Sequence, residues 1–381
     1  MIYLDNSATT RVLPEAADAA FRAMTEQFFN PASAYKAAVA TERSVGAARA
    51  RLADALGCAA DEIIYTSGGT ESNNMAVFGT LQPVRGKRRV ITCISEHPSV
   101  FKTVRSRKDD PQTEVVFIGC NPDGTASLSE LEAALTEDTA LVSLMHVNNE
   151  TGAVNDLAGA QSLIRRLSPN AVFHVDGVQA FCKLPFGGAP CDLYSVSAHK
   201  VHAPKGVGAL YVKSGVKFAG GFIGGGQENK LRSGTTNVPG ILGLDASLTQ
   251  YRAHQDEWVA QLGACKRRLA SDLLTIPDAL VNGPSVEGGA PHVLNVSFPG
   301  VRGEVLLNAL SEREIYVSTG SACSAHKKGK NRVLEAIGVT GARAEGAIRF
   351  SLCPFNTLEE MDAAATAVAE QVAFLRRFQR R

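Results

Sequence analysis

The sequence has no long apolar run, no marked excess of charge and no pair of cysteines at metal-binding spacing. Its 381 residues carry a formal net charge of +1, and 20% of them are charged, so neither a nucleic acid nor a membrane surface is expected as the main partner. No apolar segment is long enough to span a bilayer. Residues 1–5 contain an acid and no basic residue, so we expect no signal peptide and a cytoplasmic location.

The eight cysteines are too sparse for a disulfide scaffold, and none forms a Cys-x-x-Cys pair or a zinc-type cluster with histidines. We therefore expect reduced thiols and no resident metal ion. Seven of them are interpreted as small structural residues, namely Cys58, Cys93, Cys120, Cys182, Cys191, Cys265 and Cys353. The eighth, Cys323, lies in a different setting.

Strand-like and helix-like segments alternate through the first two thirds of the chain. The predicted strands are 61–66, 89–93, 114–118, 140–147, 171–176, 193–197 and 207–212, and helices are predicted over 70–80, 129–136 and 156–167. This alternation is typical of an α/β domain with a mostly parallel sheet. Ligands in such domains bind at the carboxyl ends of the strands, so functional residues are expected there.

After Gly240 the pattern changes to a weaker mixture of helices and strands. A long amphipathic segment is followed by further predicted elements, over 241–273, 293–298, 303–311, 314–318 and 358–377. The mixture predicts a smaller α+β C-terminal domain. We place the large domain at 16–245 and assign 1–15 and 246–381 to the small one.

Residues 67–71 (SGGTE) lie between a predicted strand and a predicted helix. Small residues let backbone N–H groups approach an anion, and the start of a helix favours negative charge. The segment is a candidate phosphate site, and a plain tight turn fits it equally well. It matches neither the Walker loop nor G-x-G-x-x-G, so a phosphate bound there need not belong to a nucleotide.

Asp176 ends one predicted strand, and Lys200 follows the end of the next, beside Ser197 and His199. A structural ion pair is one interpretation, because buried charges need partners. A second interpretation has a definite chemistry. A lysine can hold pyridoxal phosphate as a Schiff base, and an aspartate at the pyridine nitrogen strengthens the cofactor as an electron sink. Ser197 and His199 are then candidate phosphate ligands.

Other strand ends carry polar groups as well. His97 follows the strand 89–93, where it can stack on a ring or move protons, and Asn149 follows 140–147. Gln179 lies one turn beyond Asp176. With the segment 67–71 and Lys200, polar groups thus follow five predicted strand ends, and we expect them to converge. The glycine-rich stretch 224–235 is predicted to be either a functional loop or a flexible linker without secondary structure.

Two more residues stand out in the C-terminal part. Arg349 lies in the apolar segment 347–351 and needs a carboxylate partner, either from a substrate or from a structural Asp or Glu. Cys323 lies in a polar run beside His326 and three lysines. Positive charge stabilises a thiolate, so Cys323 is predicted to be nucleophilic; an incidental surface cysteine is the alternative.

Together these segments resemble the cysteine desulfurases of the class V aminotransferase group, nearly end to end. The matching motifs are YLDNSATT at 3–10, NPAS at 30–33, TSGGTESNN at 66–74, EH at 96–97, HVNNETG at 146–152, HVDGVQ at 174–179, SAHK at 197–200, GGGQE at 224–228, RSGTTN at 232–237, LNVSF at 294–298, GSAC at 320–323 and IRFS at 348–351. SAHK at this distance after HVDGVQ, with GSAC downstream, is highly specific as a set.

The resemblance implies PLP fold type I, with a mostly parallel seven-stranded sheet in the large domain, and pyridoxal 5′-phosphate as cofactor. Lys200 is then the Schiff-base lysine that also moves the substrate's α proton, Asp176 pairs with the pyridine nitrogen, and His97 stacks on the ring. Asn149 and Gln179 contact the 3-oxygen side. The implied phosphate ligands are Gly69, Thr70, Ser197 and His199, and Thr235 reaches the phosphate of the partner subunit's cofactor in a homodimer.

The resemblance also implies a reaction. Arg349, with Asn149, binds the carboxylate of L-cysteine, and Cys323 takes the sulfur, leaving L-alanine and an enzyme persulfide. The sulfur then passes to a scaffold or carrier protein for iron–sulfur cluster assembly, which allows a transient contact between Cys323 and a cluster. Open alternatives are sulfur donation for tRNA or cofactor thiolation, a selenocysteine lyase or another C–S lyase, and a binding platform without turnover.

Four positions depart from the family pattern. Tyr35 stands where histidine is usual, and Ala38, Lys230 and Cys353 stand where glycine is usual. None of them removes a catalytic group. They bear on the substrate entrance and on the identity of the sulfur acceptor.

Overall fold

The computed structural model describes residues 1–185, 188, 190–320 and 331–378. At its centre is a seven-stranded sheet with the order β2-β8-β7-β6-β5-β3-β4. Its strands are β2 (Ile63–Thr66), β3 (Arg88–Cys93), β4 (Thr113–Ile118), β5 (Thr139–Met145), β6 (Val172–Asp176), β7 (Leu193–Ser197) and β8 (Gly208–Val212). Neighbouring strands from β7 to β4 are parallel, whereas β8 is antiparallel to both β2 and β7. The prediction of a mostly parallel seven-stranded sheet is confirmed.

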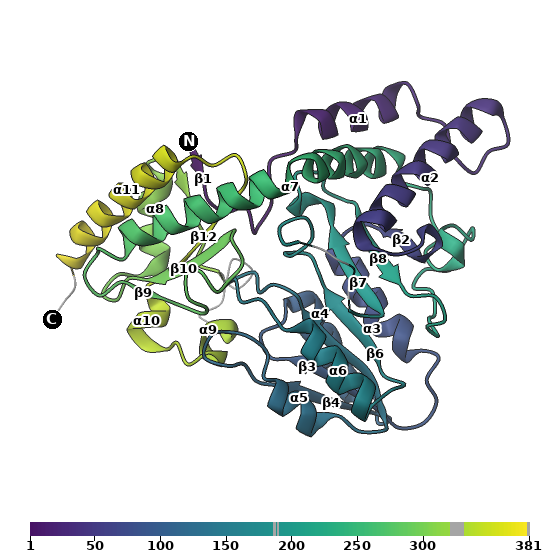
Figure 1. The fold of residues 1–381 in the computed structure, drawn as a ribbon, viewed down its shortest axis with the longest axis horizontal. Coiled ribbons are helices and arrows are strands. Elements are labelled where there is room, and N and C mark those ends of the chain that lie inside the picture. The colour runs from purple at the N-terminus through teal and green to yellow at the C-terminus, as the bar shows by residue number, and fades with distance from the viewer. Residues whose placement is uncertain (186–187, 189, 321–330, 379–381) are drawn as a thin grey trace.

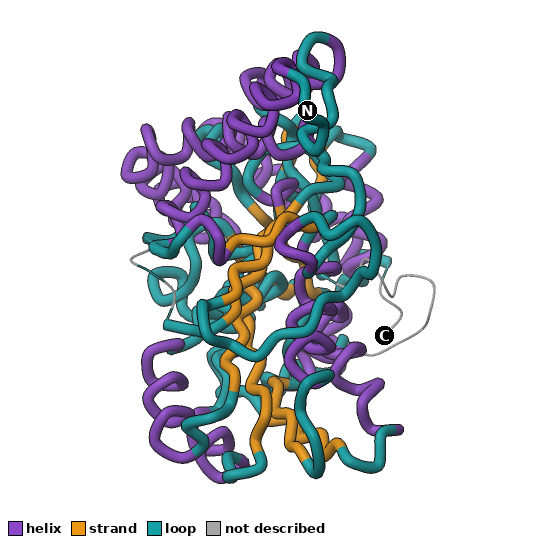
Figure 2. Tube along the Cα trace, turned by 90° about the vertical axis from the view of Figure 1, so that its right-hand side faces the viewer, coloured by secondary structure: helices purple, strands orange, loops and turns teal. Residues whose placement is uncertain are grey.

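The central strands are buried along nearly their whole length because helices cover both faces of the sheet (Figure 2). All five residues of β7 are buried, as are four of the five in β6. Continuous burial of this kind is typical of parallel strands. The helices of this part are α1 (Pro14–Thr25), α2 (Lys36–Leu56), α3 (Gly69–Leu81), α4 (Pro98–Arg105), α5 (Leu128–Ala134) and α6 (Leu157–Leu167).

A second group of strands lies beside the large sheet (Figure 1). β10 (Val293–Ser297) pairs antiparallel with β9 (Leu280–Val281) and β12 (Ala347–Ser351), and β1 (Ile2–Tyr3) pairs parallel with β11 (Ile315–Tyr316). The helices here are α8 (Gly303–Ser311), α9 (Arg332–Ala336), α10 (Gly341–Glu345) and α11 (Leu358–Arg376). No helix in the described part of the chain combines the length and the apolar composition needed to cross a membrane.

Helix α7 (Val238–Leu273) joins the two parts (Figure 1). Tyr251 in its first half belongs to the larger apolar cluster, and Leu262 in its second half belongs to the smaller one. Leu4 also packs in the smaller cluster. Because Tyr251 still packs in the larger cluster, the change from one cluster to the other lies beyond residue 251 along α7. The division into 16–245 and into 1–15 with 246–381 stays a prediction.

Some elements differ from the prediction for local reasons. The predicted strand 61–66 begins with a 3-10 turn (Ala60–Glu62), and the stretch 224–235 is not structureless, because Glu228–Lys230 form another such turn. Glu228, Asn229 and Lys230 all have positive φ. Lys230, at φ +67°, therefore adopts the conformation for which glycine is the default residue, which fits the glycine expected here from the resemblance.

Candidate functional site

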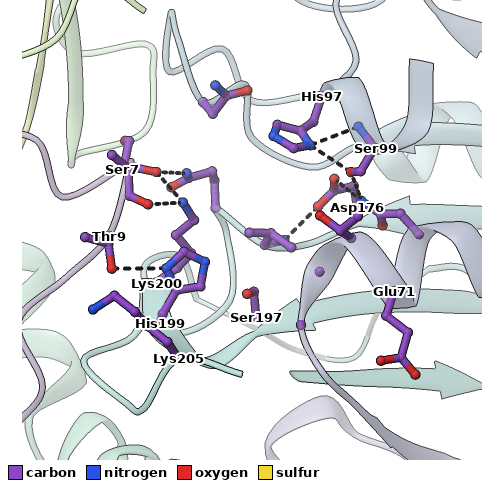
Figure 3. A pocket seen from close by; sticks show the side chains of 18 of the residues that line it. Ser7, Thr9, Glu71, His97, Ser99, Asp176, Ser197, His199, Lys200 and Lys205 are labelled. Atoms are coloured by element: carbon purple, nitrogen blue, oxygen red, sulfur yellow. Dashed lines mark hydrogen bonds between the residues drawn. The ribbon is translucent and has the colours of Figure 1, made fainter. Parts of the chain in front are cut away.

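A cavity of about 530 Å³ lies at the carboxyl ends of the strands. The predicted site residues that line it come from five strand ends, and they are Gly69, Thr70, His97, Asn149, Asp176, Gln179, Ser197, His199 and Lys200. Figure 3 shows Lys200 on one side of this space and Asp176 on the other. The prediction that the polar groups of these strand ends converge is confirmed.

Lys200 is held at the cavity by the N-terminal segment. It ends the short turn Ala198–Lys200 after β7, and its Nζ donates to the carbonyl oxygens of Ser7 at 2.6 Å and Ala8 at 2.7 Å. The same segment is tied to β12, because the Ser7 N–H donates to Ser351 Oγ at 2.8 Å. Residues far apart in the sequence thus fix where the lysine amine lies.

Asp176 is a buried carboxylate with several donors around it. Asn73 Nδ2 donates to its Oδ2 at 2.7 Å, and the Val178 N–H donates to its Oδ1 at 3.0 Å. Asn73 Nδ2 is also 2.8 Å from Ser99 Oγ. These contacts orient the carboxylate toward the cavity that it lines.

His97 caps helix α4 and is held as a neutral ring. Its Nδ1 accepts from the Ser99 N–H at 3.2 Å and lies 2.7 Å from Ser99 Oγ. Burial lowers the pKa of His97, and the nearby Lys200 lowers it further while Asp176 opposes this. His97 thus lines the cavity as a neutral imidazole whose Nδ1 is engaged in the helix cap.

The opposite end of the cavity is built for an anion. Gly68 has φ +147° and precedes helix α3, whose first N–H groups have no partners within the helix. A Cβ at Gly69 would lie 2.6 Å from Val178 Cγ2 and 3.4 Å from Ser197 Cβ. Glycine at this position thus lets the start of the helix lie directly against Ser197, at the end of β7.

The charges around this turn are consistent with anion binding. Glu71 lines the cavity, but its carboxylate accepts from Arg232 Nε at 2.8 Å and from the Ser67 N–H at 2.7 Å. Burial favours the neutral acid, yet these hydrogen bonds outweigh it and lower the pKa of Glu71. Arg232 thereby balances the one acid in the turn. Lys205 and His199 also line the cavity.

His199 is neutral at physiological pH. Burial lowers the pKa of His199 to about 4, and Lys200 and Lys205 contribute in the same direction. Its Nδ1 lies 3.1 Å from Thr9 Oγ1 (Figure 3), so the N-terminal segment orients this ring as well.

The two adjacent asparagines of the HVNNETG motif have different roles. Asn148 is buried, and its Oδ1 accepts from the N–H groups of Glu150 at 2.9 Å and Thr151 at 3.0 Å. Asn148 therefore shapes the turn, and Asn149 is the residue that faces the cavity.

Gln179 is held by a buried lysine that the sequence interpretation did not single out. Lys183 Nζ donates to Gln179 Oε1 at 3.3 Å, and Gln179 Nε2 donates to Ser7 O at 3.0 Å. With its oxygen engaged by Lys183, the amide keeps its NH₂ group on the side of Ser7. Burial lowers the pKa of Lys183 to about 7.

Two of the predicted site residues that the structure describes do not line this cavity. Arg349 is 4% exposed, and its Nη2 donates to Asp5 Oδ1 at 2.6 Å while its Nη1 donates to the Asn149 carbonyl at 3.1 Å. It thus lies directly behind Asn149. Thr235 is exposed in the loop before α7. Cys323 and His326 lie outside the described residues.

Sequence reasoning missed several side chains that complete the cavity, namely Ser7, Asn73, Ser99 and Lys205. A signal existed for one of them, since Asn73 lies four residues after Gly69 and hence on the same face of a helix. Ser7 could not be placed in this way, because its contact with Lys200 joins residues 193 positions apart.

The fold and this arrangement of residues define an enzyme of PLP fold type I. The chain belongs to the aminotransferase class-V family, whose model matches residues 2–364.

Comparisons with individual proteins agree with this membership. The chain is 38% identical to a cysteine desulfurase of Trichormus azollae over 99% of its own length and 94% of that protein. It is 40% identical to the cysteine desulfurase IscS of Anaeromyxobacter dehalogenans over 98% and 93% of the two chains.

Solved structures show the same fold. A NifS-like protein superposes with a TM-score of 0.91 at 35% identity, covering 98% of this chain and 99% of the other. A structure described as SspA in complex with cysteine has a TM-score of 0.80 at 29% identity, over 94% of this chain and all of the other.

Glu96, next to His97, gives a testable prediction. It is fully buried, and its Oε1 accepts from the Met145 N–H at 2.6 Å. Burial and, to a smaller extent, Asp176 raise its pKa well above 4.5. The folded state therefore keeps a proton that the unfolded state releases above about pH 4.5, so this group makes the wild-type protein less stable as pH rises. Glu96→Gln keeps the acceptor and cannot ionise, and its unfolding temperature relative to wild type should increase from about pH 5 to about pH 8.

The matched control is Glu96→Ala, which leaves the Met145 N–H without its acceptor and should lose ~1–3 kcal/mol of stability. Thermal unfolding of the three proteins across this pH range is the measurement. A difference between Glu96→Gln and wild type that does not change with pH would contradict the assignment of a neutral Glu96.

Proposed function

We propose that the protein is a PLP-dependent cysteine desulfurase, which converts L-cysteine to L-alanine and transfers the sulfur to its own Cys323. The observation that carries the proposal is that Lys200 and Asp176 lie on two sides of one cavity whose end is the glycine turn of α3. The relatives named cysteine desulfurase, similar over almost the whole chain, support the choice of reaction.

The residues present fit the cofactor. The start of α3 at Gly69 lines the cavity together with Ser197 and His199, and the N–H groups at the start of a helix suit a phosphate. Ser7 Oγ and Asn73 Oδ1 are buried polar atoms without a hydrogen-bond partner in the described structure. Buried polar atoms normally have partners, and both residues line the cavity. A polar ligand is expected to fill this space.

Each side chain then has a defined task. When bound, PLP withdraws electrons from the substrate and weakens its bond to sulfur. Lys200 holds the cofactor and later moves the substrate's α proton with its Nζ. Asp176 stabilises a proton on the pyridine nitrogen, and the neutral face of His97 covers the ring. Asn149 and Gln179 are assigned to the 3-oxygen side.

The substrate carboxylate is assigned to Arg349 and Asn149. Arg349 is pre-positioned by its bonds to Asp5 and to the Asn149 carbonyl, and its Nε is buried without a hydrogen-bond partner in the described structure. A guanidinium with unused donors suits a carboxylate. We call this proposed contact between Arg349 and the substrate carboxylate the carboxylate clamp. In it, the Arg349 guanidinium contacts both Asp5 and the substrate carboxylate.

The assembly and the destination of the sulfur are proposed from the family. Thr235 is exposed in the single chain, which supports its assignment to the partner subunit's cofactor phosphate in a homodimer. The proposed acceptor is a scaffold or carrier protein for iron–sulfur cluster assembly, and a cytoplasmic location is proposed with it. The relatives named IscS support this use, and tRNA or cofactor thiolation is the alternative use of the same persulfide.

The acceptor role of Cys323 predicts the outcome of a single-turnover experiment. Mixing the purified holoenzyme with L-cysteine should yield L-alanine and add one sulfur atom to the peptide that contains Cys323, as read by mass spectrometry. Cys323→Ser should still bind cysteine, but alanine formation should fall at least about 100-fold. Cys58→Ser is the matched control and should behave as wild type. Alanine and sulfide release at the wild-type rate from Cys323→Ser would rule out the acceptor role.

The carboxylate clamp predicts a loss of substrate affinity. Arg349→Ala should weaken cysteine binding by ~1.5–3 kcal/mol, the range for a hydrogen bond to a charged group. The measurement is the change of cofactor absorbance on titration with cysteine in the Cys323→Ser background. Asp5→Asn separates the clamp from the structural ion pair, because it keeps the guanidinium and removes its ionic partner. Asp5→Asn should bind cysteine with an affinity within a few-fold of that of the Cys323→Ser protein. An unchanged cysteine affinity in Arg349→Ala would refute the clamp.

A further inference from the structure

Two thiols meet behind the turn that carries His97. The sulfur atoms of Cys93 and Cys120 are 3.4 Å apart. Cys93 is the last residue of β3 and lies opposite Ile118, the last residue of the parallel strand β4. Cys120 follows two residues later. The register of the sheet therefore holds the two thiols together at its carboxyl edge, outside the residues that line the cavity.

The two thiols differ in access. Cys93 is fully buried and also contacts Ser95 Oγ at 3.2 Å and the Gly119 carbonyl at 3.6 Å. Cys120 is half-buried. A small molecule can thus reach Cys120, while Cys93 is accessible chiefly to its neighbour.

The two thiols also differ in charge. Hydrogen bonds from Cys93 and Ser95, with the positive charge of Arg332, outweigh burial and lower the pKa of Cys120 to about 7. The same pairing, together with burial, raises the pKa of Cys93. Cys120 therefore loses its proton more readily than Cys93, so the half-buried member of the pair is the one with thiolate character. A thiolate next to a second thiol is the arrangement of a reactive and a resolving cysteine.

We propose that Cys93 and Cys120 form a reversible dithiol–disulfide pair that reacts with low-molecular-weight disulfides. The proposal concerns a modification site separate from the proposed sulfur transfer, and it does not depend on that reaction. It revises the interpretation of these two cysteines as purely structural residues.

The reaction has two exchange steps. The Cys120 thiolate attacks one sulfur of the small disulfide, a mixed disulfide forms, and one thiolate leaves. Cys93 Sγ then attacks the Cys120 sulfur, forming the protein disulfide and displacing the second small thiol, which takes the Cys93 proton. The two protein sulfurs are oxidised by two electrons in total, and the small disulfide is reduced to two thiols.

The geometry requires only a short movement. A disulfide has a sulfur–sulfur distance of about 2.05 Å, so the two atoms must approach by about 1.4 Å from their 3.4 Å contact. Cys93 gives up its contact with Ser95 Oγ when it turns toward Cys120. Ser95 is two residues before His97, so the pair contacts the same turn that carries the proposed cofactor-stacking residue.

The test uses the Cys323→Ser holoenzyme, so that the proposed catalytic thiol cannot take part. The protein is equilibrated in buffers with increasing ratios of glutathione disulfide to glutathione, alkylated, digested and analysed by mass spectrometry. We expect one cross-linked species joining the peptides of Cys93 and Cys120, the loss of two free thiols per chain, and full reversal by dithiothreitol.

Three single variants in the same background separate the steps. Cys93→Ser should accumulate a mixed disulfide of glutathione on Cys120, because the resolving thiol is missing. Cys120→Ser should leave Cys93 reduced, because the buried thiol cannot reach glutathione. Cys58→Ser, which removes a half-buried cysteine elsewhere, should form the cross-link as its parent does.

Two outcomes would overturn the proposal. One is a stable mixed disulfide on Cys120 in the protein that retains Cys93, which would show that Cys93 does not resolve it. The other is that both thiols remain reduced at every ratio at which Cys58 or another cysteine has already reacted.

Discussion

The carbonyl oxygen of Ser7 accepts hydrogen bonds from both Lys200, at 2.6 Å, and Gln179, at 3.0 Å. The N–H of Ser7 donates to Ser351 Oγ at the end of β12. Ser7 therefore links three parts of the molecule, namely the turn after β7, the turn after β6 and the small sheet. Thr10 strengthens this link, because its N–H donates a hydrogen bond to the His199 carbonyl oxygen at 3.0 Å. The cavity therefore requires the first ten residues to be in place, although they contribute little to the core of the large sheet.

Burial controls the protonation of the side chains around this link. It lowers the pKa of His97 and His199 and raises that of Glu96, so these groups are neutral where solvent-exposed counterparts would be charged or mixed. The groups that keep their charge have dedicated partners, as Glu71 has in Arg232. Because these side chains are neutral or paired, the charges around this link that act on a bound ligand come mainly from Lys200 and Asp176.

The sequence predicted the residues that line the cavity well where they follow strand ends. Apolar strands followed by polar residues identified His97, Asn149, Asp176 and Lys200, because parallel strands bring their carboxyl ends to one edge. It predicted less where contacts join distant segments. The bonds of Ser7 to Lys200 and of Asp5 to Arg349 have no local signature, and neither has the register that places Cys93 against Cys120.

Elements with a weak pattern were missed for a related reason. Helix α2 is rich in alanine and carries few large apolar residues, so its period is hard to see in the sequence. Helix α4 has only eight residues and follows the His97 cap. In the sequence, the short segment around His97 and Pro98 is more typical of a loop. The turn at Glu228 is held by Arg49, whose Nη1 lies 2.7 Å from the carboxylate, and a sequence pattern does not show such a distant ion pair.

The central claim is that Lys200 is the residue that attaches the cofactor. The most direct measurement is reduction of the purified holoenzyme with borohydride, followed by digestion and mass spectrometry, with Lys200→Ala and the exposed-lysine variant Lys213→Ala in parallel. The account predicts a phosphopyridoxyl group on Lys200 in the wild-type protein and in Lys213→Ala, and neither this label nor the visible absorption band of lysine-bound cofactor in Lys200→Ala. An unchanged absorption band in Lys200→Ala, or the label on another lysine of the wild-type protein, would contradict it.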